Sequence, residues 1–216
     1  MKNPPSTLHL PPSTILSTTY FGPVEWYHRL YRADRVLLEA CESYTKQTYR
    51  NRCVIATTNG PQILTVPVEH HTPLRTSYLA PRTSHIPPLT IKDIRISNHG
   101  SWRRVHWNAL QSAYSESPFF DYYADDLRPF FERDYEFLFD YNLEIIHTVC
   151  QLLDIHPHIG ETMEWKGQEE IAGNKDHDDF VARPYWQVFD RKHGFLPNLS
   201  ILDLLFCKGP EAVFWL

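Results

Sequence analysis

The sequence contains few of the residues on which the commonest enzyme signatures depend. Its 216 residues include only eight glycines, four cysteines and two methionines. The glycines form no Gly-rich phosphate loop, and neither a His-Glu-x-x-His nor a Gly-x-Ser-x-Gly motif occurs. The sequence therefore lacks the best-known signatures of nucleotide-binding proteins, zinc proteases and serine hydrolases.

The scarcity of cysteine and of long apolar runs excludes further classes. Cys41, Cys53, Cys150 and Cys207 stand far apart without a Cys-x-x-Cys pair, so we expect free thiols rather than a zinc ribbon or a redox motif. No run approaches the roughly 18 apolar residues of a membrane-spanning helix. Residues 1–13 are rich in Pro, Ser and Thr and lack the apolar core of an export signal. These features predict a cytoplasmic protein with no membrane span.

Aromatic residues, by contrast, are abundant. They make up 14% of the chain, and hydrophobic residues make up 42%, which indicates a folded protein with a substantial core. A formal net charge of −5 disfavours nucleic acid as a partner, because a polyanion attracts basic surfaces. A local basic cluster is still able to hold a small anion, so we predict a small-molecule ligand that bears phosphate or carboxylate. The residues identify no cofactor and no oligomeric state.

The N-terminal part has the pattern of a parallel β-α-β unit. Residues 15–20 and 36–40 are predicted strands, and residues 24–33 form a predicted helix between them. Such a short strand-helix-strand sequence implies a parallel pair covered by a helix. Residues 49–57 and 62–68 follow as a predicted hairpin. The fold class is therefore α/β, with a mixed α+β arrangement as the alternative.

The second half of the chain is predicted to be mainly helical. Trp102 to Tyr114 place apolar side chains, including Val105, on one face at a spacing of about 3.6 residues, after a Ser101 cap. His106 lies on that face. The other predicted elements are a strand within 91–96, helices over 122–136 and 143–153, a strand over 185–189 and a helix over 200–207.

These elements fit one globular domain over residues 14–210. The chain length suits a single sizeable core, since domains commonly span about 100–200 residues. Residues 1–13 precede the domain. Residues 70–89 and 156–180 are rich in Pro, Thr, His or charge, and we expect both to be loop-rich inserts.

The polar run from Lys46 to Arg52 is the most distinctive stretch. If residues 49–57 form a strand, the period of two places Arg50 and Arg52 on one face, about 7 Å apart. Two guanidinium groups at that distance suit a phosphate or carboxylate, because each donates two hydrogen bonds in one plane. In the alternative interpretation the arginines pair with nearby acids: Glu39, Glu42 or Glu69.

Two further residues are candidates for proton transfer. His106 is either a hydrogen-bonded core histidine or a general acid or base at the floor of a pocket. Asp203 lies near the start of the last predicted helix, where polar groups meet the core. The predicted catalytic residues are therefore His106 and Asp203. The predicted substrate-binding residues are Tyr20, Lys46, Arg50, Asn51, Arg52 and Gln187.

Metal binding is not predicted. The run 176–179 carries oxygen and imidazole ligands, but consecutive residues in a loop rarely converge on one ion. The same applies to His70, His71 and His85, which sit in the long predicted loop.

Several longer motifs occur in a fixed order along the chain. They are Tyr44 to Arg52, Asn59 to Pro61, Thr65 to Val68, Lys92 to Ile96, Trp102 with His106 to Asn108, Ser117 to Phe120 and His193 to Leu205. Together they resemble the WbqC-like protein family, most closely its branch in Bacteroidetes, from Thr19 to about Glu211. Members encoded among O-antigen genes are labelled glycine transferases, so the resemblance implies aminoacyl transfer to a sugar during surface-polysaccharide assembly.

The chain departs from the O-antigen branch at the end of its first predicted strand. That branch has a Gln-Pro-x-Tyr-x-Pro-Trp pattern there, whereas residues 17–23 read Ser-Thr-Thr-Tyr-Phe-Gly-Pro. Ligands of α/β proteins commonly bind at such strand ends, which leaves both the substrate and the activity open.

The leading hypothesis is a group-transfer enzyme in which the arginines hold an anionic donor and His106 or Asp203 moves a proton. The alternative is a non-catalytic metabolite-binding or scaffold protein. That alternative predicts a conspicuous exposed apolar patch and no enclosed cleft beside Arg50 and Arg52.

Overall fold

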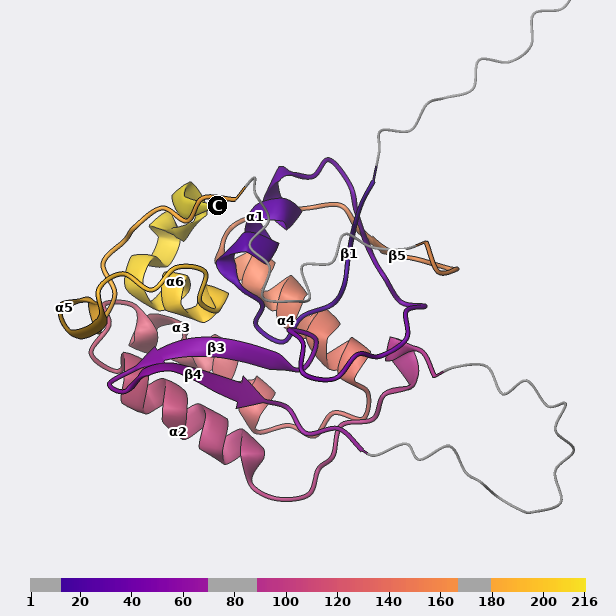
Figure 1. Ribbon diagram of the computed structural model, residues 1–216, viewed down its shortest axis with the longest axis horizontal. Coiled ribbons are helices and arrows are strands. Elements are labelled where there is room, and N and C mark those ends of the chain that lie inside the picture. The colour runs from indigo at the N-terminus through magenta and orange to yellow at the C-terminus, as the bar shows by residue number, and fades with distance from the viewer. Residues whose placement is uncertain (1–12, 70–88, 167–179) are drawn as a thin grey trace, which may run out of the picture.

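The fold combines two small sheets with helices packed around them. The computed structural model describes residues 13–69, 89–166 and 180–216. These residues contain a three-stranded parallel sheet, a two-stranded antiparallel hairpin and six α-helices. Figure 1 shows the hairpin between α2 (Trp102–Tyr114) and α6 (Ile201–Lys208), with the parallel sheet toward the opposite end of the molecule. The predicted mixed α/β fold is confirmed.

The parallel sheet joins the first strands of the chain to one strand far along the sequence. β1 (Thr14–Leu16), α1 (Val24–Arg32) and β2 (Val36–Leu38) form the predicted β-α-β unit. β5 (Ile159–Glu161) pairs in parallel with the other side of β2, so the strand order is β1-β2-β5. β5 lies inside the predicted 156–180 loop. Its three residues are too few to show an alternating pattern, so the sequence does not reveal it.

The predicted hairpin is confirmed. β3 (Arg52–Thr57) and β4 (Gly60–Thr65) pair antiparallel, and the turn between them consists of Thr58 and Asn59. Gly60 has a φ of 100°, in the left-handed region that favours glycine, and it opens β4 instead of lying within the turn. The two-residue turn fixes the register of the whole hairpin.

The start of β3 differs from the prediction in a way that matters for the arginines. In residues 48–51 the Asn51 N–H donates to the Thr48 carbonyl oxygen at 3.2 Å, which closes a turn, and the strand begins only at Arg52. Arg50 therefore precedes the strand. The prediction that Arg50 and Arg52 share one strand face is wrong, because the turn interrupts the period of two.

α2 has the predicted bounds, but its apolar stripe is narrow. Its buried face includes Trp102, His106, Leu110 and Ala113. Val105, expected on this face, is 54% exposed, because it lies to one side of the stripe. Ser101 precedes the helix, but its side chain makes no capping hydrogen bond.

The predicted helix over 122–136 is divided into two parts. α3 (Phe120–Leu127) is followed by a 3-10 segment over Arg128–Phe131. Pro129 has no N–H group with which to continue the α-helical pattern, so the helix ends there. α4 (Leu138–Leu152) begins earlier than the predicted residue 143.

Two predicted strands have other conformations. Residues 91–96 begin with a 3-10 turn at Ile91–Asp93 and continue in isolated bridges. Residues 185–189 pair with no strand among the described residues. The Gln187 side chain instead bonds to the backbone of Leu196. Gln187 Oε1 accepts from the Leu196 N–H at 2.8 Å, and Nε2 donates to the Leu196 carbonyl at 3.0 Å.

The predicted C-terminal helix is confirmed. The Ser200 hydroxyl caps α6 by accepting from the Leu202 N–H at 3.3 Å. α5 (Asp190–His193) is a single turn before it, and a 3-10 segment over Gly209–Trp215 follows.

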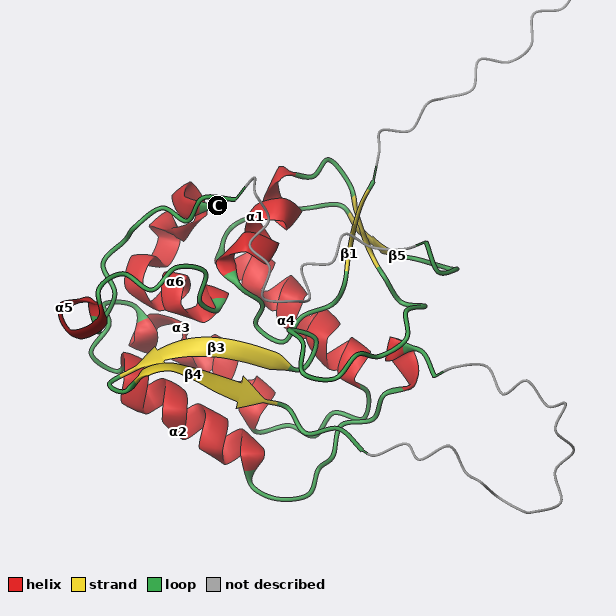
Figure 2. Cartoon of the chain, in the orientation of Figure 1, coloured by secondary structure: helices red, strands yellow, loops and turns green. Residues whose placement is uncertain are grey.

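Figure 2 shows the helices around the two sheets. One continuous core of buried side chains joins the helices to both sheets. The loop after β1 contributes two fully buried rings to this core, Tyr20 and Phe21. Tyr20 stacks on Tyr141 with ring centroids 5.8 Å apart, and Phe21 stacks on Phe131 at 5.9 Å. All four cysteines are free thiols, as expected. In the described part of the chain, no helix has the length and apolar character needed to cross a membrane.

Candidate functional site

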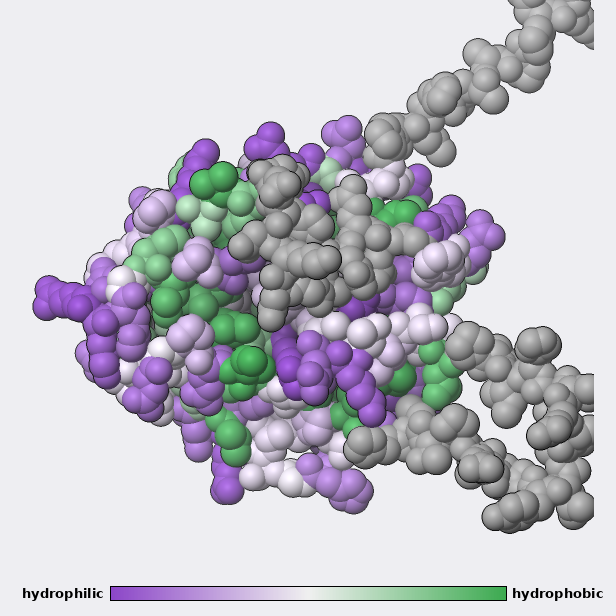
Figure 3. Space-filling model, in the orientation of Figure 1, coloured by the Kyte–Doolittle hydropathy of each residue, from purple (hydrophilic) through white to green (hydrophobic). Residues whose placement is uncertain are grey.

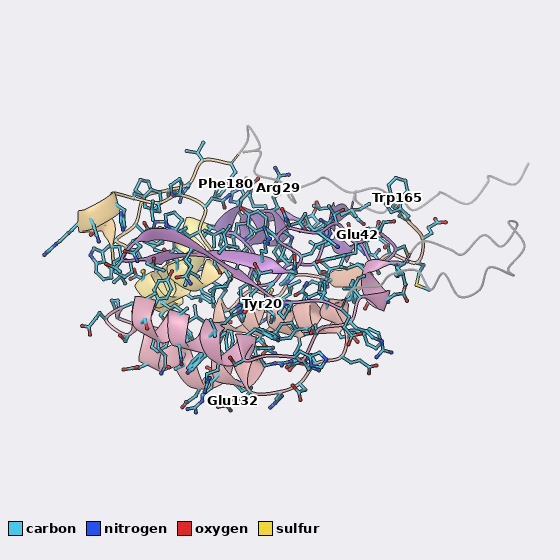
Figure 4. The ribbon with its side chains drawn as sticks, turned by 60° about the horizontal axis from the view of Figure 1, so that its bottom comes forward. Tyr20, Arg29, Glu42, Glu132, Trp165 and Phe180 are labelled. Carbon is cyan, nitrogen blue, oxygen red and sulfur yellow. The ribbon has the colours of Figure 1, made fainter. Side chains whose placement is uncertain are left out.

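The eight predicted site residues occupy four neighbourhoods instead of one. Three of them line a surface cleft: Lys46, Asn51 and Arg52. Arg50 lies in the interior beside Glu42. Tyr20 pairs with His106 in the core, and Gln187 pairs with Asp203. In Figure 4, Tyr20 lies near the centre beneath the hairpin, and Glu42 lies closer to one end of the molecule.

The cleft has a volume of about 530 Å³, within the range of sites for small organic ligands. Two stretches of chain that adjoin at the start of the hairpin form most of it. The first stretch contributes Ser43, Tyr44, Lys46, Gln47, Asn51 and Arg52. The second contributes Thr65, Val66, Pro67, Val68 and Glu69, with Leu89 and Ile94 beside it.

Backbone hydrogen bonds hold these stretches in place. The Val66 N–H donates to the Asn51 carbonyl at 2.8 Å, which continues the hairpin ladder beyond β3 and β4. Gln47 has a φ of 65°, so a residue with a side chain occupies the left-handed region at the cleft edge. Such backbone strain is often found at ligand sites.

The polar groups of the cleft include two cations, Lys46 and Arg52. Lys46 is exposed and Arg52 is half-buried. Burial raises the pKa of Tyr44 to about 12, although Arg50 and Arg52 act in the opposite direction. The Tyr44 hydroxyl is therefore protonated at neutral pH and able to donate. Glu69 is the acidic residue of the lining.

Two buried atoms at the cleft have no hydrogen-bond partner among the described residues. They are Asn51 Oδ1 and Arg52 Nε. Asn51 Nδ2 donates to the Val66 carbonyl at 3.0 Å, which fixes the orientation of the amide. A buried polar atom without a partner costs about 1–3 kcal/mol, and both atoms are inaccessible from the cleft, so they lie in its wall and not on its surface.

Arg50 follows the alternative interpretation and pairs with an acid. Its Nε donates to Glu42 Oε1 at 2.7 Å, and its Nη2 donates both to Glu42 Oε2 and to Ser17 Oγ, the latter at 2.8 Å. Its Nη1 donates to Thr48 Oγ1 at 3.2 Å. All three guanidinium nitrogens thus have protein partners, and both side chains of the ion pair are nearly inaccessible to solvent. The pair fastens the turn that precedes β3.

His106 lies behind the cleft wall. The Tyr20 hydroxyl lies 2.8 Å from His106 Nδ1, and both side chains are buried. Burial lowers the pKa of His106 to about 4, although a hydrogen bond with the backbone of Thr65 acts to raise it. The imidazole is therefore neutral at physiological pH. Thr65 itself lines the cleft, but His106 does not.

Asp203 is a buried carboxylate surrounded by donors. It accepts from the Tyr114 hydroxyl at 2.9 Å, the Tyr185 hydroxyl at 2.7 Å and Gln187 Nε2 at 2.9 Å. Burial raises the pKa of Asp203, and the three hydrogen bonds act to lower it. The arrangement ties α6 to α2 and to the preceding extended segment.

The carboxyl ends of the parallel strands, where α/β proteins often bind ligands, are filled by the chain itself. Glu39, which follows β2, is fully buried. It accepts from the Cys41 N–H at 2.9 Å, the Thr162 hydroxyl at 2.6 Å and the Lys166 N–H at 3.1 Å. The carboxylate at this sheet edge therefore serves to join β2 to the segment after β5.

Part of the cleft lining was not among the predicted site residues. Tyr44 directly precedes the polar run, and an aromatic residue next to a basic cluster was the available signal. Leu89 and Ile94 are distant in sequence, so no local pattern assigns them to the cleft.

The described residues contain no cluster of potential metal ligands. Among residues 13–69, 89–166 and 180–216, no group of three or more His, Cys, Asp or Glu side chains is placed to hold a metal ion. The runs considered for metal binding, 176–179 and the histidines of 70–85, lie outside the described residues.

Comparisons with known proteins give the relationships of the chain. The uncharacterized protein Rv1507c of Mycobacterium tuberculosis is 24% identical to this chain over an alignment of 235 residues, gaps included. The alignment covers 92% of this chain and 94% of that protein. No solved structure matches the chain. The WbqC-like protein family matches residues 18–179, a stretch that contains every residue of the cleft. Neither match distinguishes the Bacteroidetes-type branch, so that finer assignment stays a prediction. The chain belongs to the WbqC-like protein family.

Proposed function

We propose that this chain is a group-transfer enzyme of surface-polysaccharide biosynthesis that binds a small anionic donor in the cleft between residues 43–52 and 65–69. The single observation that carries the proposal is the pair of cations that line the cleft, Lys46 and Arg52. Charged hydrogen bonds to phosphate or carboxylate satisfy such groups well.

The transfer follows the chemistry that the family resemblance implies. A hydroxyl oxygen of a sugar acceptor forms a bond to the acyl carbon of the donor, which is a glycyl group in the finer form of the proposal. The bond between that carbon and the anionic leaving group breaks, the leaving group keeps the electron pair, and the hydroxyl proton passes to solvent. Lys46 and Arg52 stabilise the charge on the leaving group.

We assign His106 and Asp203 to positioning roles. His106 supports the backbone of Thr65 from behind the cleft, and Asp203 ties Gln187 to α6. Neither side chain belongs to the cleft lining, so proton transfer by either residue would require the wall to open.

A binding experiment tests the ligand site. The double variant Lys46→Gln/Arg52→Gln should weaken binding of phosphate, glycine or a nucleoside diphosphate by at least about tenfold, since a hydrogen bond to a charged group contributes about 1.5–3 kcal/mol. Isothermal titration calorimetry measures the dissociation constants. The matched control is Arg128→Gln/Arg133→Gln, which removes the same charge from an exposed region. Equal loss of affinity in both double variants would show that net charge alone, and not the cleft, attracts the anion.

A non-catalytic metabolite-binding protein is the second candidate, favoured by apolar residues that face solvent. Ile63 on β4 is 56% exposed, and Figure 3 shows hydrophobic residues gathered on part of one face. Mass spectrometry of sugar acceptors incubated with activated acyl donors separates the two candidates. Ligand binding that depends on Lys46 and Arg52, without any acyl transfer, would favour the binding protein.

A further inference from the structure

The cleft lining contains a cationic part and an apolar part. Residues 43–52 supply the cations Lys46 and Arg52 and several hydroxyl and amide groups. Val66 to Val68, which stand between Thr65 and Glu69, supply apolar groups together with Leu89 and Ile94. The cleft therefore offers two kinds of surface to the same ligand.

The polar part offers cationic donors to a ligand. Lys46 is exposed and Arg52 is half-buried, so an anionic oxygen is able to reach their charged groups. Asn51 is only 5% exposed, and its Nδ2 is held by the Val66 carbonyl, so its side chain fixes the wall of the cleft. Arg52 Nε and Asn51 Oδ1 are buried in this wall and have no partner among the described residues.

The apolar part is too extensive for an inorganic anion. Leu89 is 42% exposed and Val68 is half-buried, so apolar surface at the cleft faces solvent. A phosphate ion occupies only a small part of about 530 Å³ and leaves this surface wet. Covering it with carbon atoms is favourable, because apolar surface gains free energy when it leaves water.

We propose that the cleft takes an organic anion with an apolar body of several carbon atoms, its charged group toward Lys46 and Arg52 and its body over Val68, Leu89 and Ile94. The inference rests on the proposed function, since both place the ligand in this cleft. It adds the substrate class: a donor whose anionic leaving group carries an apolar body of several carbon atoms.

Two matched ligand series test the proposal. Nuclear magnetic resonance titrations of labelled protein in Tris buffer measure dissociation constants for acetate, butyrate and hexanoate, and for phosphate and butyl phosphate. Each added CH₂ group should tighten binding by about fourfold, so hexanoate should bind roughly sixteenfold more tightly than butyrate. The carboxylate and phosphate series together show which head group is preferred.

Variants assign the effect to the cleft. Leu89→Ser should reduce the gain in affinity that each CH₂ group of the ligand adds. Ile63→Ser, which replaces an exposed apolar residue outside the lining, should leave that gain unchanged. If affinity does not rise with the length of the ligand but still requires Lys46 and Arg52, the apolar body is overturned and the proposed anion site stands. Failure of every anion to bind, or equal affinity in Lys46→Gln/Arg52→Gln, would overturn both.

Discussion

Replacement of Glu42 by Gln should destabilise the protein strongly, because it leaves the Arg50 guanidinium buried without a counterion. The Arg50 and Glu42 side chains are 1% and 3% exposed, so solvent is unable to compensate the lost charge. Removing one partner of a buried ion pair costs about 3–5 kcal/mol. Glutamine has nearly the shape of glutamate, so the loss reports charge and not a cavity.

Urea denaturation measures this effect as a change in the free energy of unfolding. A loss of about 3–5 kcal/mol corresponds to a fall in melting temperature of about 6–20 °C for a protein of this size. The control is Glu132→Gln, which breaks the ion pair with Arg128 on the surface, where both side chains are 57% exposed. Such exposed pairs contribute about 0–1 kcal/mol.

Equal destabilisation by Glu42→Gln and Glu132→Gln would contradict the claim that the buried Arg50 guanidinium needs the charge of Glu42. Equal values would mean that water reaches the guanidinium group or that Ser17 and Thr48 alone satisfy it. A double-mutant cycle with Arg50→Met then separates the ion pair from those hydroxyl contacts.

Two other predictions concern the core. The free energy of unfolding should rise with pH between about 4 and 6.5, because burial lowers the pKa of His106 to about 4 while the unfolded chain takes up a proton at the ordinary value of 6.5. The stability that the neutral His106 contributes is complete above pH 6.5 and is lost as the pH falls toward 4. In urea denaturation at several pH values, His106→Gln should show a smaller rise of the free energy of unfolding with pH. Gly209→Ala should lower the melting temperature more than Gly100→Ala. Both glycines have positive φ, but a Cβ at Gly209 would lie 2.5 Å from the Phe119 ring, whereas nothing lies within 4 Å at Gly100. Equal melting temperatures would contradict the clash.

Local periodicity was sufficient for the elements that carry their own pattern. α2 repeats apolar residues along one face, and the hairpin consists of two strand-like runs separated by a short turn segment, so both follow from the sequence. β5 does not, because its partner strand β2 lies far away in the sequence. The Gln187 segment does not either, because a side chain bonds the backbone of Leu196 there, and no apolar periodicity indicates such a contact.

The candidate site likewise combines a stretch that the local sequence reveals with contacts that it does not reveal. The run from Lys46 to Arg52 is distinctive in composition, and Lys46, Gln47, Asn51 and Arg52 within it line the cleft. Which arginine faces the cleft depends on the turn at residues 48–51, and that turn depends on Glu42 and Ser17, which precede the run, and on Asn142 in α4.

Arg50 and Arg52 therefore have opposite uses although they are two residues apart. Arg50 gives all three nitrogens to the protein, and Asn142 Nδ2 donates to its carbonyl oxygen at 2.7 Å, so the turn is anchored from both sides. Arg52 begins the strand with its Nε unpartnered at the cleft. A buried ion pair is a weak source of net stability, but breaking it is costly, which makes it suited to fixing one geometry. We infer that the buried Arg50 holds Arg52 in place, so a variant of Arg50 that still folds should lose anion affinity although Arg50 does not line the cleft.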